Sequence, residues 1–188
     1  MNKMYASIGC CGIDCGLCPR YYTEGASRCP GCGGPDFECL HPPCSHKSCC
    51  SLKHGLEVCG QCEEFPCIKY DREKIERDSF VTHQRIFKNH EQIGKVGLDA
   101  FLDQQKERIS LLEKMLADYD GGRGKSFFCL ASALLTPEVL REALIEADLP
   151  GDRKDRERGL RVALTKYAEL EGIVLKLTKL SRSEYRAG

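Results

Sequence analysis

Cysteine is the residue type in this chain whose number and spacing point to chemistry. Thirteen of the fourteen cysteines fall between Cys10 and Cys67, and only Cys129 lies outside that window. Three pairs have two residues between the cysteines: Cys15 and Cys18, Cys29 and Cys32, Cys59 and Cys62. Such spacing lets one tight turn present both sulfurs to a single ion. The sequence therefore predicts metal sites built from thiolates.

The cellular compartment expected for the chain favours metal ligation over disulfide bonding. Residues 1–7 contain no apolar run that could act as a signal peptide. No later segment approaches the roughly 20 apolar residues of a membrane span. We therefore expect a soluble, cytoplasmic protein without a membrane partner. In a reducing cytosol a disulfide framework is disfavoured, which leaves the clustered cysteines as metal ligands.

Zinc is the metal that the ligand count favours. A closed zinc site takes four ligands, so the clustered cysteines would supply two to three zinc ions. The main alternative is an iron–sulfur cluster in an electron-transfer or redox-sensing protein, because four cysteines also hold such clusters. The bacterial ferredoxin run has gaps of about two, two and three residues before its Cys-Pro. Here the gaps before Cys18 are three and two residues, which argues against that pattern.

Residues 11–67 resemble the cysteine-rich proteins of domain-of-unknown-function family 3795. The resemblance is carried by residues 11–18 (CGIDCGLC), 29–32 (CPGC) and 59–67 (CGQCEEFPC), with three spaced cysteines between them. It implies metal binding without a defined activity. Cys10 and Cys49 fall outside the pattern. The candidate metal ligands are the cysteines inside it: Cys11, Cys15, Cys18, Cys29, Cys32, Cys39, Cys44, Cys50, Cys59, Cys62 and Cys67.

Composition changes abruptly after Cys67, where cysteine and proline almost vanish and helix-forming residues take over. We predict a cysteine-rich zinc-binding module over residues 1–70 and a helical module with a C-terminal strand over residues 71–188. Prolines and glycines interrupt the first module every few residues, which excludes long regular elements. It has few bulky apolar side chains, so bound metal should supply much of its folding free energy.

Hydrophobic periodicity predicts the elements of the second module. The spacing of apolar residues indicates helices over residues 71–93, 98–119, 126–135, 137–148 and 152–171. Residues 173–178 alternate like a strand, for which residues 4–8 are the expected partner. Cys129 falls among apolar residues and is expected in the core. The predicted fold class is mainly α: a small irregular cysteine-rich metal-stapled module followed by a helical bundle with a short C-terminal strand.

Charge and the remaining motifs favour a binding or scaffold protein over an enzyme. Twenty-eight basic and 28 acidic residues balance, so nothing demands a nucleic-acid partner. No acid–base or nucleophile constellation stands out. Arg123 and Lys125 precede a helix that Ser126 opens, where an anion can bind or where the loop forms a plain turn and cap. The expected partner is accordingly an unknown protein or a small anionic ligand.

Overall fold

The structure, a computed structural model, describes residues 3–70, 77–148 and 150–178. Across these residues the chain is mainly helical, with seven α-helices and no β-strand, which confirms the predicted helical class. The cysteine-rich part holds only short elements: the 3₁₀ turns η1 (Cys15–Leu17), η2 (Gly25–Ser27) and η4 (Cys59–Gln61), the helices α1 (Phe37–Leu40) and α2 (Ser45–Lys47), and the π-helical turn η3 (Ser48–Lys53).

Longer helices fill the rest of the described chain, and most begin and end close to the predicted residues. The oxygen Oγ1 of Thr136 accepts a hydrogen bond from the Val139 amide, and Pro137 occupies the first helical position of α7. The Asp152 side chain caps the start of α8 by accepting hydrogen bonds from backbone amides in the first turn of that helix. The long helices are α4 (Ile86–Val96), α5 (Leu98–Asp118), α6 (Lys125–Leu134), α7 (Pro137–Glu146) and α8 (Arg153–Leu170).

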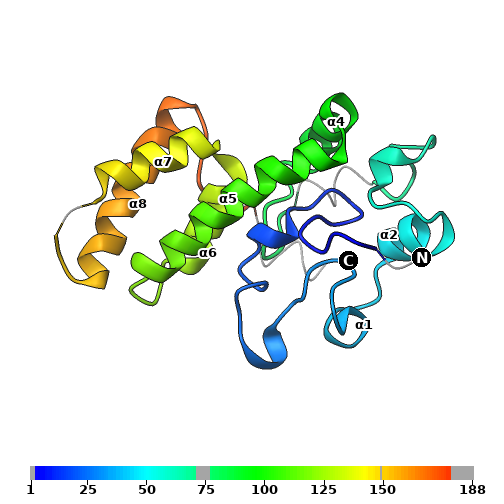
Figure 1. Ribbon diagram of the computed structural model, residues 1–188, viewed down its shortest axis with the longest axis horizontal. Coiled ribbons are helices and arrows are strands. Elements are labelled where there is room, and N and C mark those ends of the chain that lie inside the picture. The colour runs from blue at the N-terminus through cyan, green and yellow to red at the C-terminus, as the bar shows by residue number, and fades with distance from the viewer. Residues whose placement is uncertain (1–2, 71–76, 149, 179–188) are drawn as a thin grey trace, which may run out of the picture.

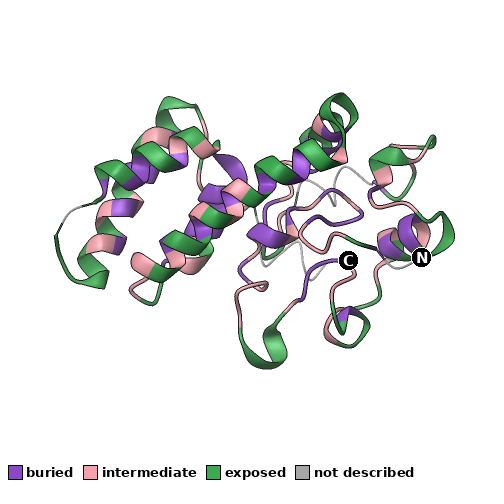
Figure 2. Ribbon diagram, in the orientation of Figure 1, coloured by how far each residue is buried: buried purple, intermediate pink, exposed green. Residues whose placement is uncertain are grey.

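Helices α5 to α8 form a bundle, and α5 runs from that bundle across to the cysteine-rich loops (Figure 1). Helices α5, α7 and α8 each have a buried face and an exposed face (Figure 2), whereas α6 is buried along most of its length. Leu112, Leu140 and Leu164 are fully buried in the bundle core. Cys129 belongs to the same core with 1% of its surface exposed, as predicted.

The cysteine-rich segment packs directly against this helical frame. Leu17, from η1, is fully buried in the bundle core. Ile8 and Val58 form a second core with Ile93 of α4 and Phe101 of α5. Apolar side chains on both sides of the predicted boundary at residue 70 therefore share two cores. Residues 71–76, which begin the predicted second module, lie outside the described residues, as do residues 179–188.

The predicted C-terminal strand is wrong. Residues 173–178 have no regular secondary structure and form no ladder with any described segment. Their alternation has another cause, since Ile173 and Leu175 pack against the bundle core while Val174 faces solvent. The expected partner, residues 4–8, bonds to the cysteine loops instead: the Ala6 carbonyl accepts from the Cys32 amide. The helix predicted over residues 71–93 begins only at Ile86, because residues 77–85 are irregular.

Candidate metal centre

Two hollows in the cysteine-rich segment gather almost all the clustered cysteines. The larger cysteine cavity, of about 600 Å³, is lined among others by Cys10, Cys11, Cys15, Cys18, Cys29, Cys32 and Cys44. The smaller cysteine cavity, of about 40 Å³, is lined by Cys49, Cys50, Cys59, Cys62 and Cys67, together with His54. The structure therefore divides the predicted ligands into six in the larger cavity and four in the smaller one. Cys39 is exposed and lines neither.

Tight backbone approaches position the cysteines of the larger cavity. Gly31, between Cys29 and Cys32, has a φ of +81°, a conformation that glycine adopts without strain. A Cβ atom at this position would lie 2.2 Å from the carbonyl oxygen of Ala6. The same carbonyl accepts the Cys32 amide at 3.1 Å. The CPGC turn is thus held against the N-terminal segment, with its cysteines facing the cavity.

Cys10, which the family pattern leaves out, lies between the two groups of thiols. It is completely buried, and the Cys32 thiol donates to its sulfur across 3.8 Å. Its carbonyl accepts the Cys59 amide at 2.8 Å, which joins the loops of the two cavities. The Cys32 hydrogen bond lowers the pKa of the Cys10 thiol, but the neighbouring Cys50 and burial outweigh it and raise the pKa to about 12.

Burial and crowding also shift the pKa values of other thiols in the larger cavity. Burial, with the nearby Cys32 and Cys44, raises the pKa of Cys11 to about 12. Burial is also the main cause that raises the pKa of Cys15. Burial raises the pKa of Cys18 as well, although the backbone amide of Arg20 opposes the rise. These thiols are protonated at neutral pH in the metal-free chain, so metal binding would release protons.

The thiols of the described residues do not have the geometry of a closed metal site. No three or more Cys, His, Asp or Glu side chains among the described residues converge as ligands of one ion. The sulfurs surround the two hollows without meeting at a point. Metal binding would therefore require cysteine side chains to rotate inward, which the irregular loops between short turns permit. The possible ligands around the two hollows are mainly cysteine side chains. Thiolates are suitable ligands for zinc and for iron–sulfur clusters.

Three polar side chains beside the cavities went unassigned in the sequence. His46 lines the larger cavity, and its Nε2 atom is buried without a hydrogen-bond partner among the described residues. His90 fits between Gly12 and Gly60, where a Cβ on either glycine would lie 2.7 Å from an imidazole nitrogen. The hydroxyl of Tyr70 lies 3.1 Å from His90 Nε2. The sequence carried two signals: His46 lies two residues after Cys44, and His90 falls with Phe87 on one face of the helix predicted over residues 71–93.

The loop before α6 is closed by the protein's own carboxylates. Asp120 Oδ1 accepts the amides of Gly122 and Gly124 at 2.8 Å. Glu157 Oε2 accepts the Gly121 amide at 2.8 Å. The Lys125 ammonium donates to the hydroxyl of Thr23 rather than standing free beside Ser126. Residues 120–124 therefore form the plain turn that the sequence left open as an alternative to anion binding at Arg123. The predicted cap at Ser126 is wrong, because α6 begins at Lys125 with Gly124 at its N-cap position and no side-chain cap hydrogen bond.

Comparison with family models, with curated proteins and with solved structures finds no match to this chain. The resemblance to family 3795 thus depends on the cysteine pattern alone. None of the described helices is long and apolar enough to span a membrane.

Proposed function

We propose that the chain binds two to three zinc ions through its cysteine-rich segment and that these ions are structural. The observation that carries the proposal is the gathering of ten predicted ligand cysteines around two hollows. Metal sites of this kind stabilise loops that have too few apolar residues to fold alone. A protein built in this way serves as a binding or scaffold protein. The cysteine pattern shared with family 3795 points in the same direction.

The smaller cysteine cavity is suited to a single ion. Its volume of about 40 Å³ exceeds the ~10–15 Å³ that a cavity needs to hold one water molecule, so a single ion fits inside. Four predicted ligands line it, the number that closes a tetrahedral zinc site: Cys50, Cys59, Cys62 and Cys67. The larger cavity, with six predicted ligands, would then hold the remaining one or two ions.

An iron–sulfur cluster in the larger cavity is the second candidate, and one observation favours it. The cavity has a volume of about 600 Å³ and is also lined by Phe37, Val81 and Ile86. An iron–sulfur cluster needs more room than a single ion. Apolar walls around the cluster, and backbone amides that point at its sulfur ligands, tune its reduction potential. The backbone amides of Arg20 and Tyr21 face the Cys18 sulfur in this way. The protein would then transfer electrons or sense redox state.

Elemental analysis separates these functions. Protein expressed with both metals and purified without oxygen should contain two to three zinc ions per chain, little iron and no acid-labile sulfide. Cys62→Ser should lose one zinc equivalent, because it removes a ligand of the smaller cavity. Cys39→Ser is the matched control, since Cys39 is exposed outside both cavities. Stoichiometric iron with sulfide would instead support the second candidate, and protein without bound metal would overturn both.

A further inference from the structure

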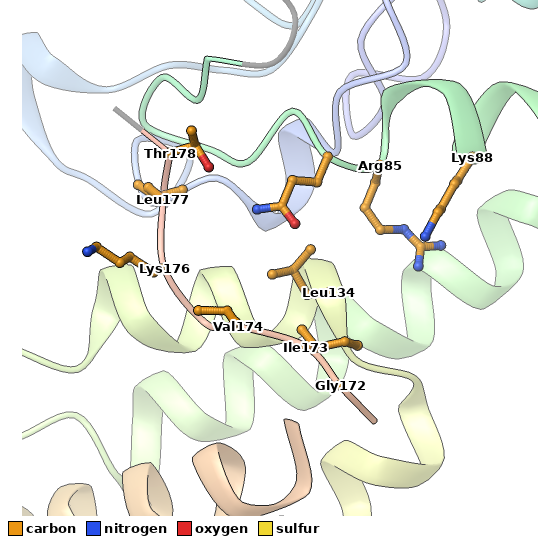
Figure 3. A pocket seen from close by; sticks show the side chains of 10 residues that line it. Arg85, Lys88, Leu134, Gly172, Ile173, Val174, Lys176, Leu177 and Thr178 are labelled. Carbon is orange, nitrogen blue, oxygen red and sulfur yellow. The ribbon is translucent and has the colours of Figure 1, made fainter. Parts of the chain in front are cut away.

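A third hollow is lined by described residues that include no cysteine. Its volume is about 750 Å³, within the range of ~300–1,000 Å³ that is usual for small-molecule sites. It lies between the start of α4, the end of α6 and residues 172–178 (Figure 3). We call it the C-terminal cavity. Its lining residues include Gln84, Arg85, Lys88, Leu134, Ile173 and Val174.

The segment that forms one wall of the C-terminal cavity is fixed at both ends, although it has no regular structure. At one end the Ile173 amide donates to the Ala168 carbonyl at 2.7 Å, directly after α8. At the other end the Asp78 amide donates to the Thr178 carbonyl at 2.8 Å. The Thr178 amide donates in return to Asp78 Oδ2, also at 2.8 Å. These anchors hold residues 173–178 in place over the hollow.

The two walls of this cavity differ in chemistry. Arg85 and Lys88 extend from the start of α4 toward Leu134 and Ile173, which present an apolar surface (Figure 3). Val174 lines the same wall with 72% of its surface exposed, so a bound molecule would cover it. No aspartate or glutamate is among the described lining residues. The walls thus combine three cationic side chains, those of Arg85, Lys88 and Lys176, with an apolar surface.

The cationic wall is electrostatically under-compensated. Burial lowers the pKa of the Arg85 guanidinium, and the neighbouring Arg108 lowers it further, while Asp14 opposes both. No carboxylate of a described residue is recorded within ion-pair distance of Arg85 or Lys88. The first turn of α4 adds the partial positive charge of a helix N-terminus. An anion placed beside Arg85 would offset the repulsion between its guanidinium and that of Arg108.

We propose that the C-terminal cavity binds a small organic carboxylate with an apolar body. The carboxylate accepts hydrogen bonds from Arg85 and Lys88, and the apolar body lies along Leu134, Ile173 and Val174. This site is separate from the cysteine cavities and does not depend on the metal that they bind. It also differs from residues 123–126, where the protein's own carboxylates occupy the turn.

Three eight-carbon probes with different head groups test the proposal on the full-length protein as purified. Octanoate, octylammonium and octanol are titrated separately, and binding is followed by amide chemical shifts in the NMR spectrum. Octanoate should bind and shift amides of residues 84–88 and 172–178, with an affinity about tenfold or more above the other two probes. Equal binding of the three probes, or no octanoate binding at millimolar concentration, overturns the proposal.

Two variants and a matched control locate the contacts. Arg85→Gln with Lys88→Gln should weaken octanoate binding about tenfold or more, because both charged donors are lost. Val174→Asp, at an exposed position that tolerates a polar side chain, should weaken it by repelling the carboxylate. Lys95→Gln removes an exposed charge farther along α4, where Lys95 pairs with Glu91, and should bind octanoate normally. If the first two variants bind octanoate as Lys95→Gln does, the ligand lies elsewhere and the proposal is wrong.

Discussion

The side-chain amide of Gln105 donates a 2.8 Å hydrogen bond to the carboxylate of Asp14, although 91 positions separate the two residues. Asn89 Nδ2 donates to the other carboxylate oxygen at 2.8 Å, and an Arg108 nitrogen lies 3.7 Å away. Asp14 itself is 2% exposed. A single carboxylate within the CGIDC run therefore ties the cysteine-rich loop to both α4 and α5.

Asp14→Asn should destabilise the whole protein. The new amide would present N–H groups to donors that now find an acceptor, and it would leave the buried Arg108 without its counter-charge. Loss of one partner from such a network costs about 3 kcal/mol. Urea unfolding followed by helical circular dichroism measures the loss. Asp103→Asn is the control, because Asp103 is exposed and pairs only with exposed Lys106 on the same helix. Equal stability of the two variants would contradict the role of Asp14.

Leu17→Ala should destabilise the helices even though Leu17 belongs to the cysteine-rich segment. Its side chain is fully buried in the bundle core, where η1 packs against α5 and α6, so truncation opens a cavity there. Such truncations cost about 3 kcal/mol. Leu52→Ala, at a residue of the same segment with 54% of its surface exposed, should change little. If neither variant shifts the unfolding of the helices, the two segments fold independently.

The helices were predictable because local signals decide them. Each signal acts within a few residues of the helix that it specifies. These signals are the apolar periodicity of α5, the Thr136–Pro137 start of α7 and the Asp152 cap of α8. The two hollows of the cysteine segment were not predictable. The spacing of cysteines along the sequence indicates which of them share a turn, but it does not indicate which turns face each other in the fold. Cys10 and Cys39 show this limit: Cys10, which the family pattern leaves out, lines the larger cavity, and Cys39, which the pattern includes, lines neither.

The strand prediction failed for a related reason. Residues 173–178 alternate in burial because they lie against a helical core, and alternation alone does not distinguish that surface from a sheet. Asp14 gave no signal either, since its partners are on α4 and α5, far away in sequence. Contacts between distant segments decide these features, and a single sequence contains no local trace of them.

Removal of the zinc that we propose should lower the melting temperature of the helices as well as loosen the cysteine loops. The sequence suggested that the helical segment would be indifferent to metal, but Ile8, Leu17 and Val58 share its cores. Loss of several kcal/mol of binding energy corresponds to a decrease of about 10 °C or more in a protein of this size. Circular dichroism melts with a strong chelator and a reductant measure the change, with zinc-saturated chelator as the control. An unchanged midpoint would instead support independent modules divided near residue 70.

Protonation of His90 should destabilise the fold between pH 6.5 and about 4. Burial lowers the pKa of this histidine from 6.5 to about 4, so the folded protein holds it neutral where the unfolded chain would charge it. Stability from the neutral ring is complete above pH 6.5 and is lost as the pH falls through that window, by a total on the order of 3 kcal/mol.

His90→Gln isolates this effect, because glutamine can still hydrogen-bond to Tyr70 but cannot take up a proton in that range. Acid also releases zinc from thiolates, but that loss is common to both proteins, so the difference between their unfolding free energies reports on His90 alone. The wild-type protein should lose stability more steeply than the variant as the pH falls from 6.5 to 4.5. Curves that fall in parallel would show that His90 does not control the acid response, since the buried imidazole would then titrate at its ordinary pKa.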